Sequence, residues 1–356
     1  MQPARMLEIR SAKLRRVTAG RQVDFKLYAY EWILIAHLVV LTIVARAESL
    51  EFLSLFRDIF RAIEISLLSA TVGGIALRAG HAALSGRWPR YRAVITSPGW
   101  IVDTIRLVIA EAALTLVYGW MKLVVPVFNH RLFDQQLWDI DRAISFGFSP
   151  NLFVLALFSN SSFLRLIDWA YANIFVATML IAFAYFLSAP SRRLRLAFMT
   201  SNVLLWIWGA YLYLLVPSLG PAYRFPQLWF EYAAQLQTTQ RMQALLMRNY
   251  TNMLALNRGV NTPVSLIYGI AAFPSLHVAW QALVALWMRR EWVYGEVLFS
   301  VMLFVIFIGS MITGWHYLVD GIAGVVLALA AYYAVVRSFK LRRWFALHRS
   351  LRVRRP

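Results

Sequence analysis

Eight apolar runs are the feature that most constrains how this chain folds. A helix needs about 20 apolar residues to cross a bilayer, and a chain in lipid must satisfy its backbone hydrogen bonds internally. The runs cover residues 27–45, 59–77, 101–125, 167–189, 197–217, 275–288, 293–313 and 315–336. Of the 356 residues, 60% are hydrophobic and only 15% are charged. We therefore predict an all-α, polytopic transmembrane helical bundle with about eight spans.

The formal net charge of +19 has its main source between these runs. Of the 36 Lys and Arg residues, 24 lie in five short segments, at residues 1–26, 78–92, 190–196, 289–290 and 337–356. Eight spans that start from a cytoplasmic N-terminus place all five segments on one side, in agreement with the positive-inside rule. We therefore predict an integral protein of the cell inner membrane with both termini in the cytoplasm, and we expect no nucleic-acid partner.

Two long connections, 126–166 and 218–274, lie on the opposite, non-cytoplasmic side in this topology. The first has apolar residues at helical spacing with acids between them, which predicts a short interfacial helix. The second contains a polar helical stretch near 226–256. That helix could be a lid over a site at the membrane surface or a structural cap on the bundle.

The segment Phe273-Pro-Ser-Leu-His277 opens the sixth run. Pro274 suits the first turn of a helix, where its missing N–H has no consequence. The hydroxyl of Ser275 and the free backbone N–H groups of that turn can hold an anion. His277 follows in the same turn, so the segment combines an anion site with a titratable group.

The segment Gly314-Trp-His-Tyr-Leu-Val-Asp320-Gly-Ile-Ala-Gly324 opens the last run. His316 and Asp320 are four residues apart and would share one face of a helix, where a carboxylate can make the imidazole a better nucleophile. Asp320 lies within the apolar run, where an ionisable group is a functional candidate. Gly321 and Gly324 allow a neighbouring helix to approach closely.

Each of these residues alone has a structural explanation. A single His near a helix end often only packs there, and a buried Asp can bridge two helices. Two His and one Asp could also ligate zinc or iron, although no further ligand cluster accompanies them. The chain has no cysteine, which excludes thiol catalysis and Cys-based metal sites. Both motifs occur at span ends on the same side, so we favour a catalytic pair of histidines.

At these residues the chain resembles the type 2 phosphatidic acid phosphatase superfamily, and within it the inositol phosphorylceramide synthase-like branch with its bacterial relatives. The Asp-x-x-Leu-x-x-Ile-Asp pattern that begins at Asp134, followed by Phe-Gly-x-Ser-Pro150, is similar to a feature of that branch. The resemblance covers roughly residues 130–336. It implies a six-helix core and catalysis through a phosphohistidine, without metal or cofactor.

The resemblance also implies roles for four residues. His316 matches the nucleophile, Asp320 the acid that orients it, and His277 the general acid. Ser275 matches a hydroxyl that contacts the phosphate. Two cationic features of the superfamily's phosphatases are missing, because no Lys-x6-Arg-Pro motif is present and Ser310 stands where they carry an Arg.

Cations that clamp the phosphate must therefore come from elsewhere. The outer connection 218–274 holds four basic residues, Arg224, Arg241, Arg248 and Arg258. We prefer Arg258, because it lies between the polar helix and the sixth run. The ionisable residues of the third run are interpreted as structural or interfacial. They are Asp103, Arg106, Glu111 and Lys122.

The chain divides into three parts on these grounds. Residues 1–100 hold a basic segment and two accessory spans, 101–336 form the catalytic membrane core, and 337–356 are a basic cytoplasmic tail. We expect a membrane phosphatase or phosphotransferase whose partners are a lipid phosphate and an alcohol or lipid acceptor, with transfer favoured over hydrolysis. A transporter and a non-catalytic scaffold are the alternatives from other classes. The absence of an inverted repeat disfavours the first, and the intact His277, His316 and Asp320 disfavour the second.

Overall fold

The computed structural model describes residues 25–47 and 53–339. The basic segment predicted at the N-terminus lies almost entirely outside these ranges, as does the basic tail from residue 340 onward. Within the described ranges every regular element is a helix and no strand is present. The predicted all-α class is confirmed.

Eight long helices coincide with the eight predicted runs. They are α2 (Ala29–Ala47), α3 (Leu53–Leu84), α5 (Pro98–Leu123), α9 (Ser161–Leu187), α10 (Arg192–Leu215), α13 (Leu276–Glu291), α14 (Val293–Ile312) and α15 (Leu318–Ser338). In the described part of the chain, seven of the eight are long and apolar enough to cross a membrane. The exception is α13, which has 16 residues.

Helix α13 is enclosed by protein on most sides because α10, α14 and α15 pack around it. Its side chains Trp280 and Trp287 are fully buried. Small residues permit this packing. A Cβ at Gly324 of α15 would lie 2.4 Å from the carbonyl oxygen of Ser275, so the close approach predicted at this glycine is confirmed. The first turns of α13 and α15, which carry the two motifs, are therefore neighbours.

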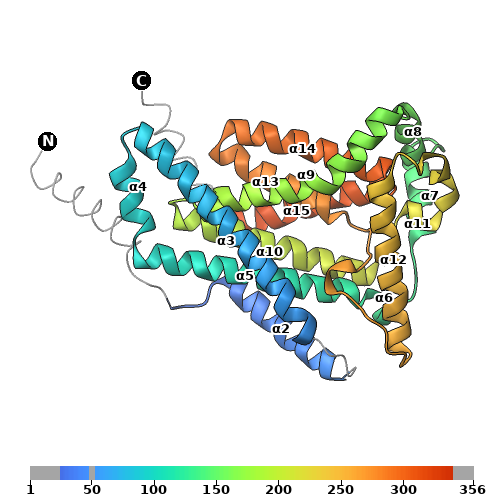
Figure 1. The fold of residues 1–356 in the computed structure, drawn as a ribbon, viewed down its shortest axis with the longest axis horizontal. Coiled ribbons are helices and arrows are strands. Elements are labelled where there is room, and N and C mark those ends of the chain that lie inside the picture. The colour runs from blue at the N-terminus through green and yellow to red at the C-terminus, as the bar shows by residue number, and fades with distance from the viewer. Residues whose placement is uncertain (1–24, 48–52, 340–356) are drawn as a thin grey trace, which may run out of the picture.

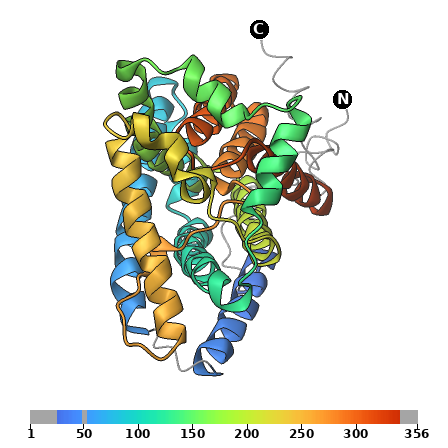
Figure 2. The same ribbon diagram turned by 90° about the vertical axis from the view of Figure 1, so that its right-hand side faces the viewer.

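The two connections predicted to lie on one side gather at one end of the bundle (Figures 1 and 2). The first forms α6 (Val125–Phe128), α7 (Asp134–Ile144) and α8 (Pro150–Leu157). The second forms α11 (Pro221–Arg224), a 3₁₀ segment (Pro226–Tyr232) and α12 (Gln237–Asn257). The short helix predicted in the first connection is present as α7. The polar helix begins later than predicted, because residues 226–232 form the 3₁₀ turn.

Helix α4 (Trp88–Ile95) lies at the opposite end of the bundle (Figure 1). The ends of α3 and α9 meet there, since Arg78 Nε donates to Ser188 Oγ over 2.9 Å. In the third span, each of two charges pairs with another helix: Arg192 Nε lies 2.8 Å from Asp103 Oδ2, and Arg106 pairs with Glu31. These ion pairs fit the structural interpretation of Asp103 and Arg106.

Candidate active site

His316 lies in the tight turn between α14 and α15. Gly314 has φ +73°, a conformation that favours glycine, and a Cβ there would lie 2.6 Å from Cβ of Ala222. The backbone N–H groups of Trp315 and His316 both donate to the carbonyl of Ser310, over 2.9 and 3.2 Å. The turn thus holds His316 immediately before Tyr317, the N-cap of α15.

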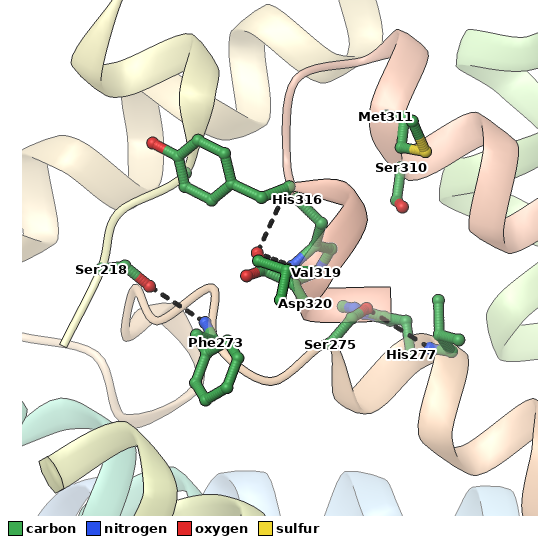
Figure 3. Close-up of polar contacts among 12 residues, drawn as sticks. Ser218, Phe273, Ser275, His277, Ser310, Met311, His316, Val319 and Asp320 are labelled. Carbon is green, nitrogen blue, oxygen red and sulfur yellow. Dashed lines mark hydrogen bonds and ion pairs between the residues drawn. The ribbon is translucent and has the colours of Figure 1, made fainter. Parts of the chain in front are cut away.

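His316 and Asp320 face one another, but not as two residues on one helical face. Helix α15 begins at Leu318, so the carboxylate reaches back from the first helical turn. Asp320 Oδ2 accepts the backbone N–H of Tyr317 over 3.0 Å and lies 3.3 Å from His316 Nδ1 (Figure 3). Both side chains are buried. A proton on Nδ1 that is donated to Asp320 leaves the Nε2 lone pair free for attack.

His277 comes to this pair from the first turn of α13. Ser275 is the N-cap of that helix, and its Oγ accepts the N–H of Val278 over 3.5 Å. Pro274 lies one residue before this cap rather than in the first turn, and its bond to Phe273 is cis. The N–H of Ser275 donates to the carbonyl of Asp320 over 2.9 Å, which joins the two motifs directly.

The structure brings the two histidines together. Their ring centroids are 6.0 Å apart, with the planes inclined at 60°. The far side of His277 is aromatic, because the ring of Phe175 lies 4.3 Å away edge-on and the Tyr171 hydroxyl is 3.5 Å from Nδ1. One phosphorus centre could lie between the two imidazoles. Within the described ranges, no three His, Asp or Glu side chains are arranged to hold a metal ion.

Burial controls the charge of His316. It lowers the pKa of the imidazole to about 3, and the positive charge of Lys122 acts in the same direction. A hydrogen bond to the backbone of Ala272 opposes them. The imidazole therefore takes up a proton only in strong acid, and it is neutral at physiological pH.

This pKa gives an expected pH profile for the first chemical step. Formation of a covalent enzyme intermediate from an activated aryl ester of a lipid phosphate should vary by less than about twofold between about pH 5 and 8. An unperturbed imidazole, with a pKa of about 6.5, would lose roughly thirtyfold of its neutral form by pH 5. The diester keeps one negative charge over this range, so rapid-quench measurements report the enzyme. A loss that follows a pKa near 6.5 would contradict the assignment.

Lys122, which its sequence context predicts to be structural or interfacial, is a cation near the two histidines. It lies near the end of α5, with its ammonium 5.8 and 5.7 Å from the ring centroids of Tyr118 and Tyr213. Its charge acts on both His277 and His316. The only indication in the sequence is its position near the end of the third run, on the same side as the two motifs.

The four arginines of the outer connection lie at the surface of the protein. Arg224, Arg241, Arg248 and Arg258 are all exposed. Arg258 is the C-cap residue of α12, and the structure does not bring it into contact with either histidine. Ser310 is buried and donates its hydroxyl to the carbonyl of Phe307. Ser275 is fully buried, with its hydroxyl at the helix cap.

The first connection holds the turn that carries His316. Asn151 Nδ2 donates to the carbonyls of Met311 and His316, over 3.1 and 2.8 Å. The Asp141 carboxylate accepts the N–H groups of Leu318 and Val319, over 2.6 and 2.9 Å. Burial raises the pKa of Asp141 to about 6, and these two N–H groups oppose that shift. These supporting residues were not predicted as part of the site.

The second connection covers the same turn. Trp229 Nε1 donates to the carbonyl of Ile312 over 2.9 Å, and Gln243 Nε2 donates to the carbonyl of Thr313 over 3.2 Å. The N–H groups of Thr238 and Thr239, at the start of α12, donate to the Asp168 carboxylate of α9, each over 2.8 Å. The connection is thus fastened to both the bundle and the turn that carries His316.

A helical membrane bundle with a buried histidine, a partly buried histidine and a buried carboxylate at its capped end defines a class of integral membrane protein with a candidate acid–base and nucleophilic site. The family model of the PAP2 superfamily matches residues 135–334, more than half of the chain. The chain therefore belongs to the PAP2 superfamily, and this membership with its apolar helices fits a membrane lipid phosphatase-type protein. No curated protein and no solved structure matches it significantly.

Proposed function

We propose that this protein is a membrane enzyme that takes the phosphoryl group, or a phosphate-linked headgroup, from a lipid and passes it on through phospho-His316. The observation that carries this proposal is the convergence of His277 from α13, Asp320 from α15 and His316 from the turn before α15. The donor is a phospholipid or a phosphate of the polyprenyl or sphingolipid type. The positive-inside distribution of Lys and Arg supports an inner-membrane protein whose capped end, with the site, faces away from the cytoplasm.

The first step forms a nitrogen–phosphorus bond. Nε2 of His316 attacks phosphorus, and the bond to the lipid oxygen breaks with its electron pair on that oxygen. His277 takes up a proton when the negative charge of the bound phosphate offsets the burial of its ring. It then gives that proton to the leaving oxygen, so that an alcohol departs. Asp320 stabilises the positive charge that develops on the His316 ring, since it faces Nδ1 over 3.3 Å.

The second step reverses these roles. A hydroxyl of the acceptor, or water, gives its proton to His277 while its oxygen attacks phosphorus. The nitrogen–phosphorus bond breaks, its electron pair returns to Nε2, and His316 is again neutral. Protons and charge balance over the two steps, so the cycle needs no further reactant.

A cation must neutralise the equatorial oxygens during both steps. We assign this role to Lys122, since its charge acts on both histidines. Arg258 is the second candidate, because it caps the end of α12 in the connection that leads to α13. Ser275 caps the first turn of α13, and the start of that helix would favour a bound phosphate.

Transfer to an alcohol is favoured over hydrolysis. The connection 218–274 covers the turn that carries His316 and so limits the approach of water. A bound hydroxyl held in line with phosphorus gains an effective concentration of roughly 10⁵ M or more. The likeness of the Asp134–Pro150 segment to the inositol phosphorylceramide synthase-like branch points in the same direction. A simple lipid phosphate phosphatase is the alternative.

The test supplies a panel of labelled donor lipids to the purified protein and raises each acceptor class from none to saturation. We expect a new lipid product to appear and the release of free phosphate or headgroup phosphate to fall as the acceptor binds. The protein with His316→Ala measures the uncatalysed background. Constant release without a new lipid product would show a hydrolase. No turnover of any donor would contradict the enzyme itself.

A further inference from the structure

Helix α7 joins two parts of the site that are far apart in the sequence. Its residues Asp134, Leu137, Trp138 and Asp141 are buried, and their spacing of three, four and seven places them on one face. Leu137 and Trp138 pack in an apolar cluster with Trp229 and Tyr317. The two carboxylates lie at either end of this face. The Asp141 carboxylate accepts two N–H groups from the start of α15. The Asp134 carboxylate has other partners.

The Asp134 carboxylate accepts hydrogen bonds from two separate segments. It accepts the N–H of Gly220 over 2.8 Å and that of Leu219 over 3.0 Å, at the base of the connection 218–274. It also accepts the hydroxyl of Tyr317 over 2.9 Å. The carboxylate is 1% exposed. A buried carboxylate is stable only when such donors replace water, so its position depends on both segments.

Tyr317 lies between the proposed nucleophile His316 and Asp320, the carboxylate that faces its ring. It follows His316 directly, and its own N–H donates to the Asp320 carboxylate. Its ring is fully buried, 6.4 Å from the ring of Trp138. A displacement of the hydroxyl end of Tyr317 therefore moves the backbone that sets the distance between His316 and Asp320.

The base of the connection has little freedom of its own. Gly220 has φ +108°, and a Cβ there would lie 2.4 Å from the carbonyl oxygen of Trp315. The N–H of Phe133, next to Asp134, donates to the carbonyl of Pro217 over 2.8 Å. A displacement of the backbone at residues 217–220 would therefore displace the Asp134 carboxylate by a similar amount.

We propose that Asp134 and Tyr317 are a pair of positioning residues that couples the connection 218–274 to the nucleophile, so that His316 and Asp320 align when the connection is seated. This inference rests on the proposed function and adds a way in which the activity of the same site is regulated. A lipid that seats the connection would thereby also align the nucleophile.

The experiment uses two substitutions that preserve shape. Tyr317→Phe removes only the hydroxyl, and Asp134→Asn removes the charge. Tyr333→Phe, at an exposed position on the same helix, and Asp139→Asn, at an exposed position on α7, are the matched controls. Hydrogen–deuterium exchange of the substrate-free protein follows the backbone at 217–225 and 313–320. Turnover with saturating lipid is measured in parallel.

We expect Tyr317→Phe to speed exchange at 217–225, a segment distant in the sequence from the substitution. It should lower kcat about tenfold with little change in KM. The double variant should be no slower than Asp134→Asn alone, since both remove one coupling. Both controls should match the unchanged protein. A merely structural role would change the melting temperature but leave exchange at 217–225 and kcat of the folded protein unaltered.

Two results separate this inference from the proposed function. If the exchange at 217–225 responds but no donor lipid is turned over, the coupling exists and the proposed function fails. If donor lipid is turned over but Tyr317→Phe behaves like Tyr333→Phe in both measurements, the coupling fails and the proposed function stands. Independent, multiplicative effects of Asp134→Asn and Tyr317→Phe on kcat would also overturn the coupling.

Discussion

Replacement of His316 by alanine should lower turnover by about 10⁴-fold or more, because a covalent route cannot proceed without its nucleophile. His277→Ala should differ in kind. It should abolish reaction of an alkyl lipid phosphate but retain formation of the covalent intermediate from an aryl ester, whose leaving group needs little protonation. For both variants, the amount of acid-labile phosphate on the protein after rapid quench measures how much covalent intermediate forms.

His130→Ala is the matched control, since His130 is exposed at the capped end of the bundle. It should retain full activity. Near-normal turnover of His316→Ala would refute the assignment of the nucleophile. Equal losses of His277→Ala with alkyl and aryl esters would instead remove the general-acid role from His277 and leave that of His316 intact.

Lys122→Gln should lower kcat/KM by roughly 10²–10³-fold, as the loss of a charge that stabilises a transition state typically does. The ammonium of Lys122 is the cation whose charge acts on both His277 and His316. Arg258→Gln is the matched substitution, and we expect a change of less than about threefold because Arg258 is exposed. Steady-state kinetics with one donor lipid compares the two.

If Arg258→Gln lowered kcat/KM more than Lys122→Gln, the cation that binds the phosphate would be Arg258 and not Lys122. That result would mean that the connection 218–274 moves its C-terminal part toward the histidines during turnover. A small effect of both substitutions would place the charge stabilisation in the backbone N–H groups at the start of α13.

The helices could be predicted because their signal is local. Each of the eight apolar runs became a long helix, and both histidine motifs proved to lie at helix starts. Details that depend on a neighbour were missed. Ser275 rather than Pro274 begins the cap of α13, and α15 begins two residues after His316, because contacts between the two turns decide where each helix starts.

The supporting residues of the site could not be predicted from local patterns. The bond from the Tyr317 hydroxyl to Asp134 joins residues 183 positions apart, and that from Leu318 to Asp141 joins residues 177 positions apart. The seven-residue spacing of the two acids indicates a shared helical face but not what lies opposite it. Lys122 was predicted to be structural for the same reason. The apolar residues around it in the sequence do not indicate which residues lie near its side chain in the folded protein.

The sequence by itself determined that this chain enters a membrane as helices and that two histidines and one aspartate open two of them, because hydropathy and short motifs depend only on residues close along the chain. Only the tertiary structure decided that the ring centroids of His277 and His316 lie 6.0 Å apart, and that α7 joins the outer connection to the turn that carries His316. Those relations arise from packing between helices. A buried carboxylate or imidazole takes its position and its pKa from partners that packing alone supplies.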